Sequence, residues 1–334
     1  MPSTPINTVV TYEGKLAKDL YFAPIINNIA LTDQGLKMIE DIQSRLYVFY
    51  NSKLDKVTKA NPGCSSSVTG TGTAITRELI QVTDLEIYLS QCYTVFDQTL
   101  YEAARKKGKD IADLTGTEIE TLMRDTIMPT IERDFQRILW LADTSNVGDT
   151  DYSMLDGLFV KITAAVTAGD VENVTTAAVT TPALAFDVLN RVYLNQKLVM
   201  KAQPLNSKVF LVTQDVYENY VQYLSTLGTD EISHTNLVSG ISAVKFMGIP
   251  VIPMPLWTDY LAADFPSEDQ SRVILLVKEE ALIVGMDASS DTTNVEIWYE
   301  KKDKLNYTRV DYKLGTFIKH TEYLSVANFG NNSN

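Results

Sequence analysis

The chain has 334 residues, 45% of them hydrophobic, which is enough for one elaborate domain or two smaller ones. Its formal net charge of −13 argues against a nucleic-acid-binding protein, which needs lysine and arginine to displace counterions. No apolar run reaches the ~18 residues of a membrane span, and the N-terminal MPSTPINTVV lacks the pattern of a signal peptide. The two cysteines, Cys64 and Cys92, make no disulfide framework, so we expect a protein made in a reducing cytoplasm.

The N-terminal residues are typical of an extended arm rather than of a core. Four turn or breaker residues are spread through this part of the chain: Pro2, Pro5, Gly14 and Pro24. Apolar spots at Leu20-Tyr21-Phe22 and Ile25-Ile26 could dock such an arm on a neighbouring molecule. An ordinary ordered terminus that packs on its own domain fits the same residues equally well.

A long hairpin is predicted next. Leu46–Tyr50 is a strand candidate rich in aromatic and branched residues, and a second strand is predicted from Ile75 to about Leu89. The segment KANPGCSSSVTGTGTA between them has the composition of a loop tip. Because an isolated hairpin is marginally stable in water, this one needs a partner surface, either its own domain or another subunit. A short helix is predicted over residues 94–107, closed by Gly108.

The strongest helical pattern covers residues 117–142. Thr117 and Glu120 form a capping box at its start. Apolar residues then recur at every fourth position: Ile119, Met123, Ile127, Ile131 and Phe135. Pro129 removes one hydrogen bond, so the helix either bends there or divides into two shorter helices joined at Thr126–Met128.

Strands and helices mix between residues 152 and 262. Thr181-Pro182 begins a helix, with threonine as the cap and proline in the first turn. Lys208–Val212 is predicted to be a buried strand, and Thr213 to cap another helix. The stretch 244–252 is predicted to form a strand, a turn and a second strand. This mixture indicates an α/β or α+β domain with its own core.

From Val273 the pattern changes to strands. Val273–Val277 and Leu282–Met286 are short and apolar, whereas Asn294–Glu300 and Thr308–Leu314 alternate between apolar and polar residues. Such alternation is typical of antiparallel strands with one solvated face. The last residues, NFGNNSN, are typical of a loose tail.

Candidate catalytic residues are scarce. His234 and His320 are the only histidines, and neither has a second histidine or a cysteine at ligand spacing. Cys92 lies on an apolar segment and is expected to be a buried small hydrophobe. Cys64 is the more reactive thiol of the two, yet no nearby histidine would activate it. These residues give no support for an enzyme but do not exclude one, and we expect no cofactor and no metal site.

The order of these parts, together with local motifs, resembles the major capsid proteins of tailed phages, which have the Hong Kong 97-type shell fold. Ile131-Glu132 leading to Leu139-Trp140 and Asp143 is similar to the end of that family's spine helix. Leu155-Asp156-Gly157-Leu158 resembles the segment that enters the axial domain. The stretch 247–252 followed by Met254-Pro255 resembles that domain's closing turn, and 281–287 the strand that returns to the peripheral domain.

The resemblance implies an α+β Hong Kong 97-type capsid fold with five parts. These are an N-terminal arm at 1–45, an extended hairpin loop at 46–93, a peripheral domain at 94–151 and 263–326 that includes the spine helix at 117–142, an axial domain at 152–262, and a C-terminal tail at 327–334.

The function implied is that of a non-catalytic structural protein. Copies would assemble as hexamers and pentamers into the icosahedral head of a phage, made in the host bacterial cytoplasm and enclosing double-stranded DNA without reading its sequence. Portal, scaffolding and decoration proteins are the expected partners beside the chain itself. Thirteen residues are candidates for contacts between subunits: Tyr21, Phe22, Tyr50, Lys53, Lys56, Cys64, Arg77, Glu78, Arg124, Arg133, Arg137, Trp257 and Tyr260. The alternatives are an encapsulin-type cellular compartment, which shares the shell fold, and an unrecognised soluble enzyme.

Overall fold

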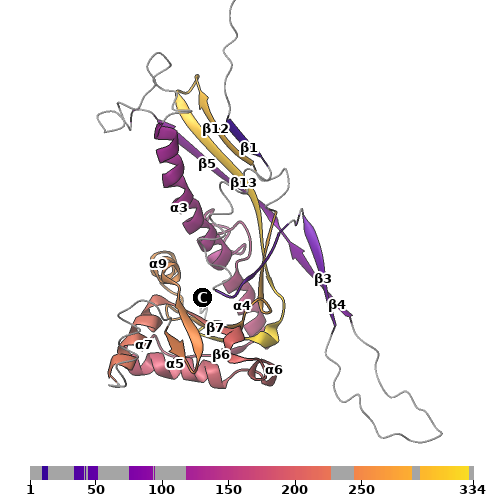
Figure 1. Ribbon diagram of the computed structural model, residues 1–334, viewed down its shortest axis with the longest axis vertical. Coiled ribbons are helices and arrows are strands. Elements are labelled where there is room, and N and C mark those ends of the chain that lie inside the picture. Colours follow the sequence, from indigo (N-terminus) through magenta and orange to yellow (C-terminus); the bar gives the residue numbers. More distant parts are fainter. Residues whose placement is uncertain are drawn as a thin grey trace, which may run out of the picture.

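The described part of the chain contains two six-stranded sheets, a long helix that runs alongside one of them, and a two-stranded ribbon to one side (Figure 1). The structure is a computed structural model, and it describes residues 10–13, 34–40, 42, 44–51, 75–92, 94, 118–226, 244–287 and 294–330. The predicted helix at 94–107 and most of the N-terminal arm lie outside these residues.

The first sheet has the strand order β1-β12-β13-β11-β2, with β5 pairing along the other edge of β13. Its strands are β1 (Val10–Glu13), β2 (Lys37–Ile39), β5 (Thr83–Cys92), β11 (Leu282–Met286), β12 (Asn294–Glu300) and β13 (Leu305–Ile318). Burial alternates along β13, because its even-numbered residues face the core while its odd-numbered residues face outward. The predicted alternation of this segment is confirmed.

Helix α3 (Glu118–Leu141) is a single uninterrupted helix of 24 residues with Pro129 inside it. The alternative prediction, two helices joined at Thr126–Met128, is therefore wrong. Pro129 is exposed, so water can satisfy the carbonyl group that its missing N–H leaves unpaired. The C-terminal half of the predicted apolar stripe, from Ile131 to Leu139, is buried. The residue expected to cap the helix, Thr117, lies outside the described residues.

The second sheet has the strand order β6-β14-β10-β7-β9-β8. Its strands are β6 (Glu172–Val174), β7 (Lys208–Val212), β8 (Lys245–Phe246), β9 (Ile249–Pro253), β10 (Val273–Val277) and β14 (Leu324–Ala327). The helices and short turns of this part are α4 (Leu158–Thr167), α5 (Pro182–Leu194), α6 (Leu198–Lys201), η4 (Leu205–Ser207), α7 (Gln214–Thr226), α9 (Pro255–Asp264) and η5 (Thr321–Tyr323).

Helix α5 begins where the sequence predicts, with Pro182 in its first turn, but the cap differs from the expectation. The Thr181 side chain makes no capping hydrogen bond. Instead its backbone carbonyl accepts the N–H groups of Leu184 at 3.1 Å and Ala185 at 3.2 Å. Of the two start signals in the sequence, the structure therefore keeps the proline in the first turn.

The boundary expected at residue 262 does not separate the two sheets. Strand β10 pairs with β7 and β14, so it belongs to the second sheet although it follows that boundary. The chain crosses to the first sheet in the turn between β10 and β11, where Glu279 adopts a φ of 61°. It returns through η5 to β14. Apolar pattern alone could not show this, because β10 and β11 are buried runs of the same length and character.

The predicted loose tail is wrong for its first residues. Asn328 and Phe329 are buried. The Asn328 side-chain amide donates to the Ser271 carbonyl and to Thr176 Oγ1 (3.1 Å for the second), and its oxygen accepts the Thr176 N–H at 2.8 Å. Phe329 stacks edge-on against Phe159 with ring centroids 5.2 Å apart. The many asparagines of NFGNN predicted an exposed tail, but an asparagine whose side chain is hydrogen-bonded can be buried.

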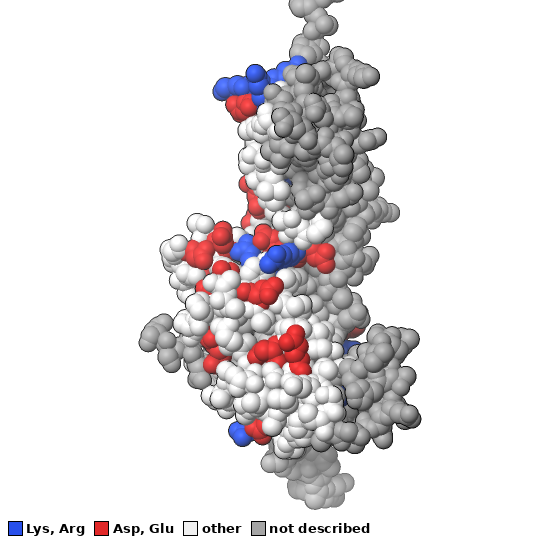
Figure 2. Space-filling view, turned by 90° about the vertical axis from the view of Figure 1, so that its left-hand side faces the viewer, with Lys and Arg blue, Asp and Glu red and all other residues white. Residues whose placement is uncertain are grey.

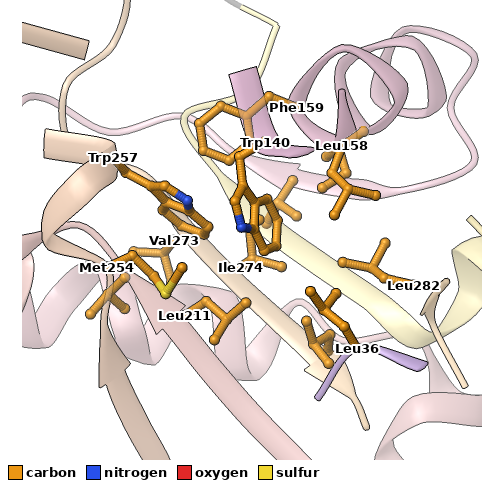
Figure 3. Packing of buried hydrophobic residues seen from close by; sticks show 14 of the residues in the cluster. Leu36, Trp140, Leu158, Phe159, Leu211, Met254, Trp257, Val273, Ile274 and Leu282 are labelled. Carbon is orange, nitrogen blue, oxygen red and sulfur yellow. The ribbon is translucent and has the colours of Figure 1, made fainter. Parts of the chain in front are cut away.

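Three aromatic side chains join α3, α4 and α9 in the main core (Figure 3). The rings of Trp140 and Trp257 meet edge-on at 4.6 Å, and Phe159 packs against Trp257 at 4.8 Å. The Trp140 Nε1 donates to Gln136 Oε1 at 3.1 Å, so its polar atom is satisfied inside the core. Leu211, Val273 and Ile274 of the second sheet lie beneath these rings in Figure 3.

The motif Leu155-Asp156-Gly157-Leu158 holds the end of α3 against the start of α4. A Cβ at Gly157 would lie 2.8 Å from the Trp140 carbonyl oxygen, so only glycine allows the two helix ends to approach this closely. The Gly157 N–H donates to the Ala142 carbonyl at 2.7 Å, and Asp156 Oδ1 accepts the Thr144 N–H at 3.1 Å.

Residues 247 and 248 form the predicted turn between two strands. Met247 and Gly248 have φ values of 49° and 83°, which is the conformation of a two-residue hairpin turn. This turn joins β8 to β9.

Candidate assembly surfaces

The predicted hairpin is confirmed as a two-stranded antiparallel ribbon. Strand β3 (Arg45–Asn51) pairs with β4 (Ile75–Gln81) in a continuous register from Arg45↔Gln81 to Asn51↔Ile75. The second predicted strand is divided at Val82, because β5 continues beyond it into the first sheet. No third strand within the described residues pairs with β3 or β4. Figure 1 shows the ribbon extending away from both sheets.

The outer face of this ribbon is apolar and open. Phe49 is 63% exposed and Tyr47 45%, and Leu79, the cross-strand partner of Tyr47, is exposed beside them. The Arg77 guanidinium lies over the Tyr47 ring at 4.6 Å. Exposed large side chains that gather on one face mark an interaction surface. We call Tyr47, Phe49, Arg77 and Leu79 the ribbon face.

The inner face of the ribbon is also apolar, but it packs on its own chain. Ile80 belongs to a small core cluster that is separate from the main core, and Leu46 and Val48 pack against this cluster. Its other members are Ile42, Val82 and Ile283. Strand β3 therefore carries apolar side chains on both faces, and the described residues pack against only one of these faces.

A second aromatic surface lies on the outward side of the first sheet. Tyr88 of β5 stacks on Tyr307 of β13 with centroids 5.4 Å apart, and Trp298 of β12 stacks on Tyr307 at 5.5 Å. Tyr88 is 54% exposed. The Tyr307 hydroxyl donates to Asp303 at 3.3 Å, and Glu86, two residues before Tyr88, lies 3.0 Å from Arg309 Nε.

Charge is distributed unevenly over the surface. Figure 2 shows carboxylates scattered over the face that carries α7 and α9, and basic side chains gathered at the end of the molecule nearest the β12–β13 turn. That turn contributes the exposed residues Lys301, Lys302 and Lys304. The same turn contains the exposed Asp303, so this end of the face in Figure 2 carries both signs of charge.

Three of the candidate contact residues form a network between α3 and α9. Arg133 Nε donates to the Tyr260 hydroxyl at 3.0 Å, and its guanidinium lies over the Tyr260 ring at 5.3 Å. Arg137 pairs with Asp134 at 2.8 Å and lies 5.0 Å from the Tyr152 ring. These arginines therefore make contacts within their own subunit.

The Tyr152 hydroxyl extends that network to α9, where it donates to Asp264. Burial and this hydrogen bond raise the pKa of the Tyr152 phenol, so it stays a neutral donor. The loop before α4 is thereby fastened to α9.

The remaining candidate contact residues fall into four groups. Trp257 is 1% exposed in the core, so its expected position on a contact surface is wrong. Arg77 lies on the ribbon face. The backbones of Tyr50, Glu78 and Arg124 are described within β3, β4 and α3, but their side chains are not. The others, Tyr21, Phe22, Lys53, Lys56 and Cys64, lie outside the described residues.

One small cavity has an ion pair in its lining. A cavity of about 80 Å³ beside α4 is lined by Phe159, Glu268 and Arg272, among others. Its arginine is ion-paired with Glu268 and lies between the rings of Phe159, at 4.7 Å, and Phe329, at 4.9 Å. Ligand pockets usually measure ~300 Å³ or more, so this cavity is small for a substrate.

Of the histidines and cysteines, the structure describes His320 and Cys92. His320 packs edge-on against the Tyr323 ring at 5.4 Å. Cys92 is half-buried rather than buried, with its Sγ 3.0 Å from Thr94 Oγ1. His234 lies outside the described residues. Within the described part of the chain, no group of three or more His, Cys, Asp or Glu side chains is placed to hold a metal ion. Likewise, no helix described here is long and apolar enough to cross a membrane.

The chain has the fold of phage capsid shell proteins. Over 92% of its length it superposes on 90% of a chain from the procapsid of satellite phage P4, with a TM-score of 0.59 and 9% identity. A chain from the capsid of a native GTA particle matches over 90% of both chains, with a TM-score of 0.57 and 13% identity. The SrpI encapsulin of Synechococcus elongatus PCC 7942 gives a TM-score of 0.50 at 12% identity, over 90% of this chain and 88% of that one. No model of a known protein family and no curated protein sequence matches.

The two aromatic surfaces were not predicted from the sequence, although the composition of β3 indicated the ribbon face. RLYVFYN has large apolar residues at consecutive positions, so both faces of β3 are apolar. Such a strand is normally covered on both sides. The Tyr88–Tyr307–Trp298 stack had no comparable pattern, because its three residues come from three different strands.

Proposed function

We propose that this chain, which has the fold of phage capsid shell proteins, is the major subunit of an icosahedral phage head. Copies assemble as hexamers and pentamers and enclose double-stranded DNA, and the protein has no catalytic role. The observation that carries the proposal is the pairing of this fold with the ribbon face. A shell fold that matches over about nine-tenths of both chains accompanies a projecting ribbon with an exposed apolar face.

The physics of the ribbon supports assembly with further copies. A two-stranded ribbon is marginally stable alone, and among the described residues only its inner face packs on the rest of the chain. Covering Tyr47, Phe49 and Leu79 with a neighbouring subunit would remove from water the apolar surface that the fold leaves open. In the proposed head the ribbon lies across the adjacent subunit.

The charge of the chain fits a container for DNA. A net charge of −13 repels a polyanion, so packed DNA does not adhere to the wall. Portal and scaffolding proteins, and decoration proteins on the outside, are the partners proposed for such a head. The protein is made in the cytoplasm of the host bacterium and ends in the virion.

A cellular compartment is the second candidate, and the structural match to an encapsulin favours it specifically. The two candidates differ in what the shell contains. Particles purified from the native source would hold DNA in the first case and a cargo protein in the second.

Electron microscopy of the expressed chain tests the proposal. We expect closed shells, or hexameric and pentameric capsomers, when the purified protein is concentrated. Size-exclusion chromatography of the same sample should show a species far larger than the 37.2 kDa chain. A protein that stays monomeric at high concentration, with and without a co-expressed scaffolding protein, would refute it.

A further inference from the structure

The ribbon leaves the first sheet over a pair of glycines. Gly285 of β11 and Gly315 of β13 are direct cross-strand partners. Three buried residues at the ribbon root lie over them: Ile42 before β3, Ile80 in β4 and Val82 after it. We call these two glycines and three apolar side chains the glycine seat.

Neither glycine has room for a side chain. A Cβ at Gly315 would approach the Gln81 carbonyl oxygen to well under 3.0 Å, a distance that real Cβ atoms essentially never show. A Cβ at Gly285 would lie 2.9 Å from Ile42 Cδ1 and 3.2 Å from Ile80 Cγ2. The root of the ribbon therefore rests directly on the backbone of the sheet.

Two backbone hydrogen bonds hold the root in this position. The Ile42 N–H donates to the Met286 carbonyl at 3.1 Å, which ties the segment before β3 to the end of β11. The Val82 N–H donates to the Ser44 carbonyl at 3.2 Å, which closes the base of the ribbon. The four residues of the local cluster, Ile42, Ile80, Val82 and Ile283, are grouped apart from the main core.

We propose that the glycine seat sets the direction in which the ribbon leaves the sheet, and that Gly285 and Gly315 are positioning residues for assembly. The inference rests on the proposed function, because the direction of the ribbon decides which surface of a neighbour it reaches. A polar cavity of about 210 Å³ adjoins the seat and is lined by Gln81, Gly315 and Thr316, among others.

The size of the effect follows from the geometry. At Gly315 the overlap with the Gln81 carbonyl requires the root to retreat by roughly 1 Å to reach ordinary contact. Over ~7 Å, the length of two strand residues, this retreat tilts the ribbon by about 8°. Phe49 lies four residues beyond the root, or ~13 Å from it, so the tilt moves it by about 2 Å relative to the root.

The experiment measures the ribbon direction in unassembled full-length chains. Spin labels are placed at Phe49→Cys on the ribbon and Lys302→Cys on the β12–β13 turn, in a chain carrying Cys64→Ser and Cys92→Ser. Electron paramagnetic resonance then gives the distance distribution between the labels. We expect Gly315→Ala to shift its mean by about 2 Å or to broaden it by as much. Gly148→Ala, whose Cβ would meet nothing within 4 Å, is the matched control and should leave it unchanged.

A pair of compensating substitutions distinguishes a displaced ribbon root from a general loss of folding. Gly285→Ala collides first with the Cδ1 of Ile42, an atom that valine lacks. We expect Gly285→Ala alone to shift the distribution, and Gly285→Ala with Ile42→Val to restore most of it. The same Ile42→Val change should not rescue Gly315→Ala, because that collision is with backbone. Circular dichroism and thermal unfolding confirm that each variant is folded.

Distances in Gly285→Ala and in folded Gly315→Ala that match the parent would overturn the inference, as would a Gly285→Ala shift that Ile42→Val leaves unaltered. If Gly315→Ala does not fold, the Gly285 pair decides alone. Shell yield is scored separately in chains without labels, and we expect at least a tenfold loss for Gly315→Ala. A parent chain that forms no shells would refute the proposed function while the distance measurement still decides the seat.

Discussion

Removing the Phe49 side chain should weaken assembly without weakening the subunit. Phe49 is 63% exposed, and a phenylalanine has ~200 Å² to bury, so about 125 Å² remains open in the isolated chain. At ~25 cal/mol per Å², covering that area contributes about 3 kcal/mol, of which the atoms that alanine lacks contribute about 2 kcal/mol. Each subunit has one ribbon, so Phe49→Ala should raise the concentration needed for assembly roughly 30-fold.

The assay follows light scattering against protein concentration, with electron microscopy of the end points. Val147→Ala is the matched control, because Val147 is 84% exposed in the loop after α3 and lies off the ribbon. The free energy of unfolding of the Phe49→Ala subunit should stay within ~0.5 kcal/mol of the parent, as for other exposed positions. An unchanged assembly threshold, or an equal rise for both variants, would show that a neighbour does not cover the ribbon face.

Three further substitutions test the core and its ionisable groups. Trp140→Ala removes a fully buried ring, so urea denaturation should show a loss of about 4 kcal/mol, and a loss under ~1 kcal/mol would contradict the packing. Glu268→Gln leaves the buried Arg272 guanidinium without its ion pair and should cost about 2 kcal/mol, after a discount for the partly exposed carboxylate. The exposed pair made by Asp187 is the control, and Asp187→Asn should cost under ~0.5 kcal/mol. Burial raises the pKa of Tyr220 to about 12, so the folded chain keeps the phenol proton longer than the unfolded chain does. Stability from this group is full below ~pH 10 and falls as the pH rises towards 12, and Tyr220→Phe should flatten that fall in denaturation curves at pH 9 to 12. An identical slope in the variant would count against the buried phenol.

Local structure was largely predictable because it depends on neighbours in the chain. The helix that ends at Leu141, the ribbon of β3 and β4, and the turn at Met247-Gly248 each rest on periodicity or turn chemistry that is written in consecutive residues. The sequence did not predict that β10 and β14 belong to the second sheet, because strand pairing joins residues that lie far apart in the chain.

In the candidate assembly surfaces, too, local patterns were predictable and contacts between distant residues were not. The exposed apolar face formed by Tyr47 and Phe49 could have been predicted from the sequence. These residues alternate with Leu46 and Val48, so both faces of β3 are apolar. The contact between Arg133 and Tyr260 was not predictable, because it exists only where the fold places α9 beside α3, and their expected contact with a neighbour stays a prediction. A side chain's partner depends on the packing of whole elements, which no local pattern records.

The sequence by itself determined that the chain is acidic and apolar enough to fold, that it carries a long helix and a projecting hairpin, and that it has few groups suited to catalysis. Only the tertiary structure decided that Trp257 belongs to the core, that Asn328 and Phe329 are buried, and that two glycines lie under the ribbon root. The physical reason is that periodicity follows from the geometry of one element. Burial, by contrast, follows from which elements meet.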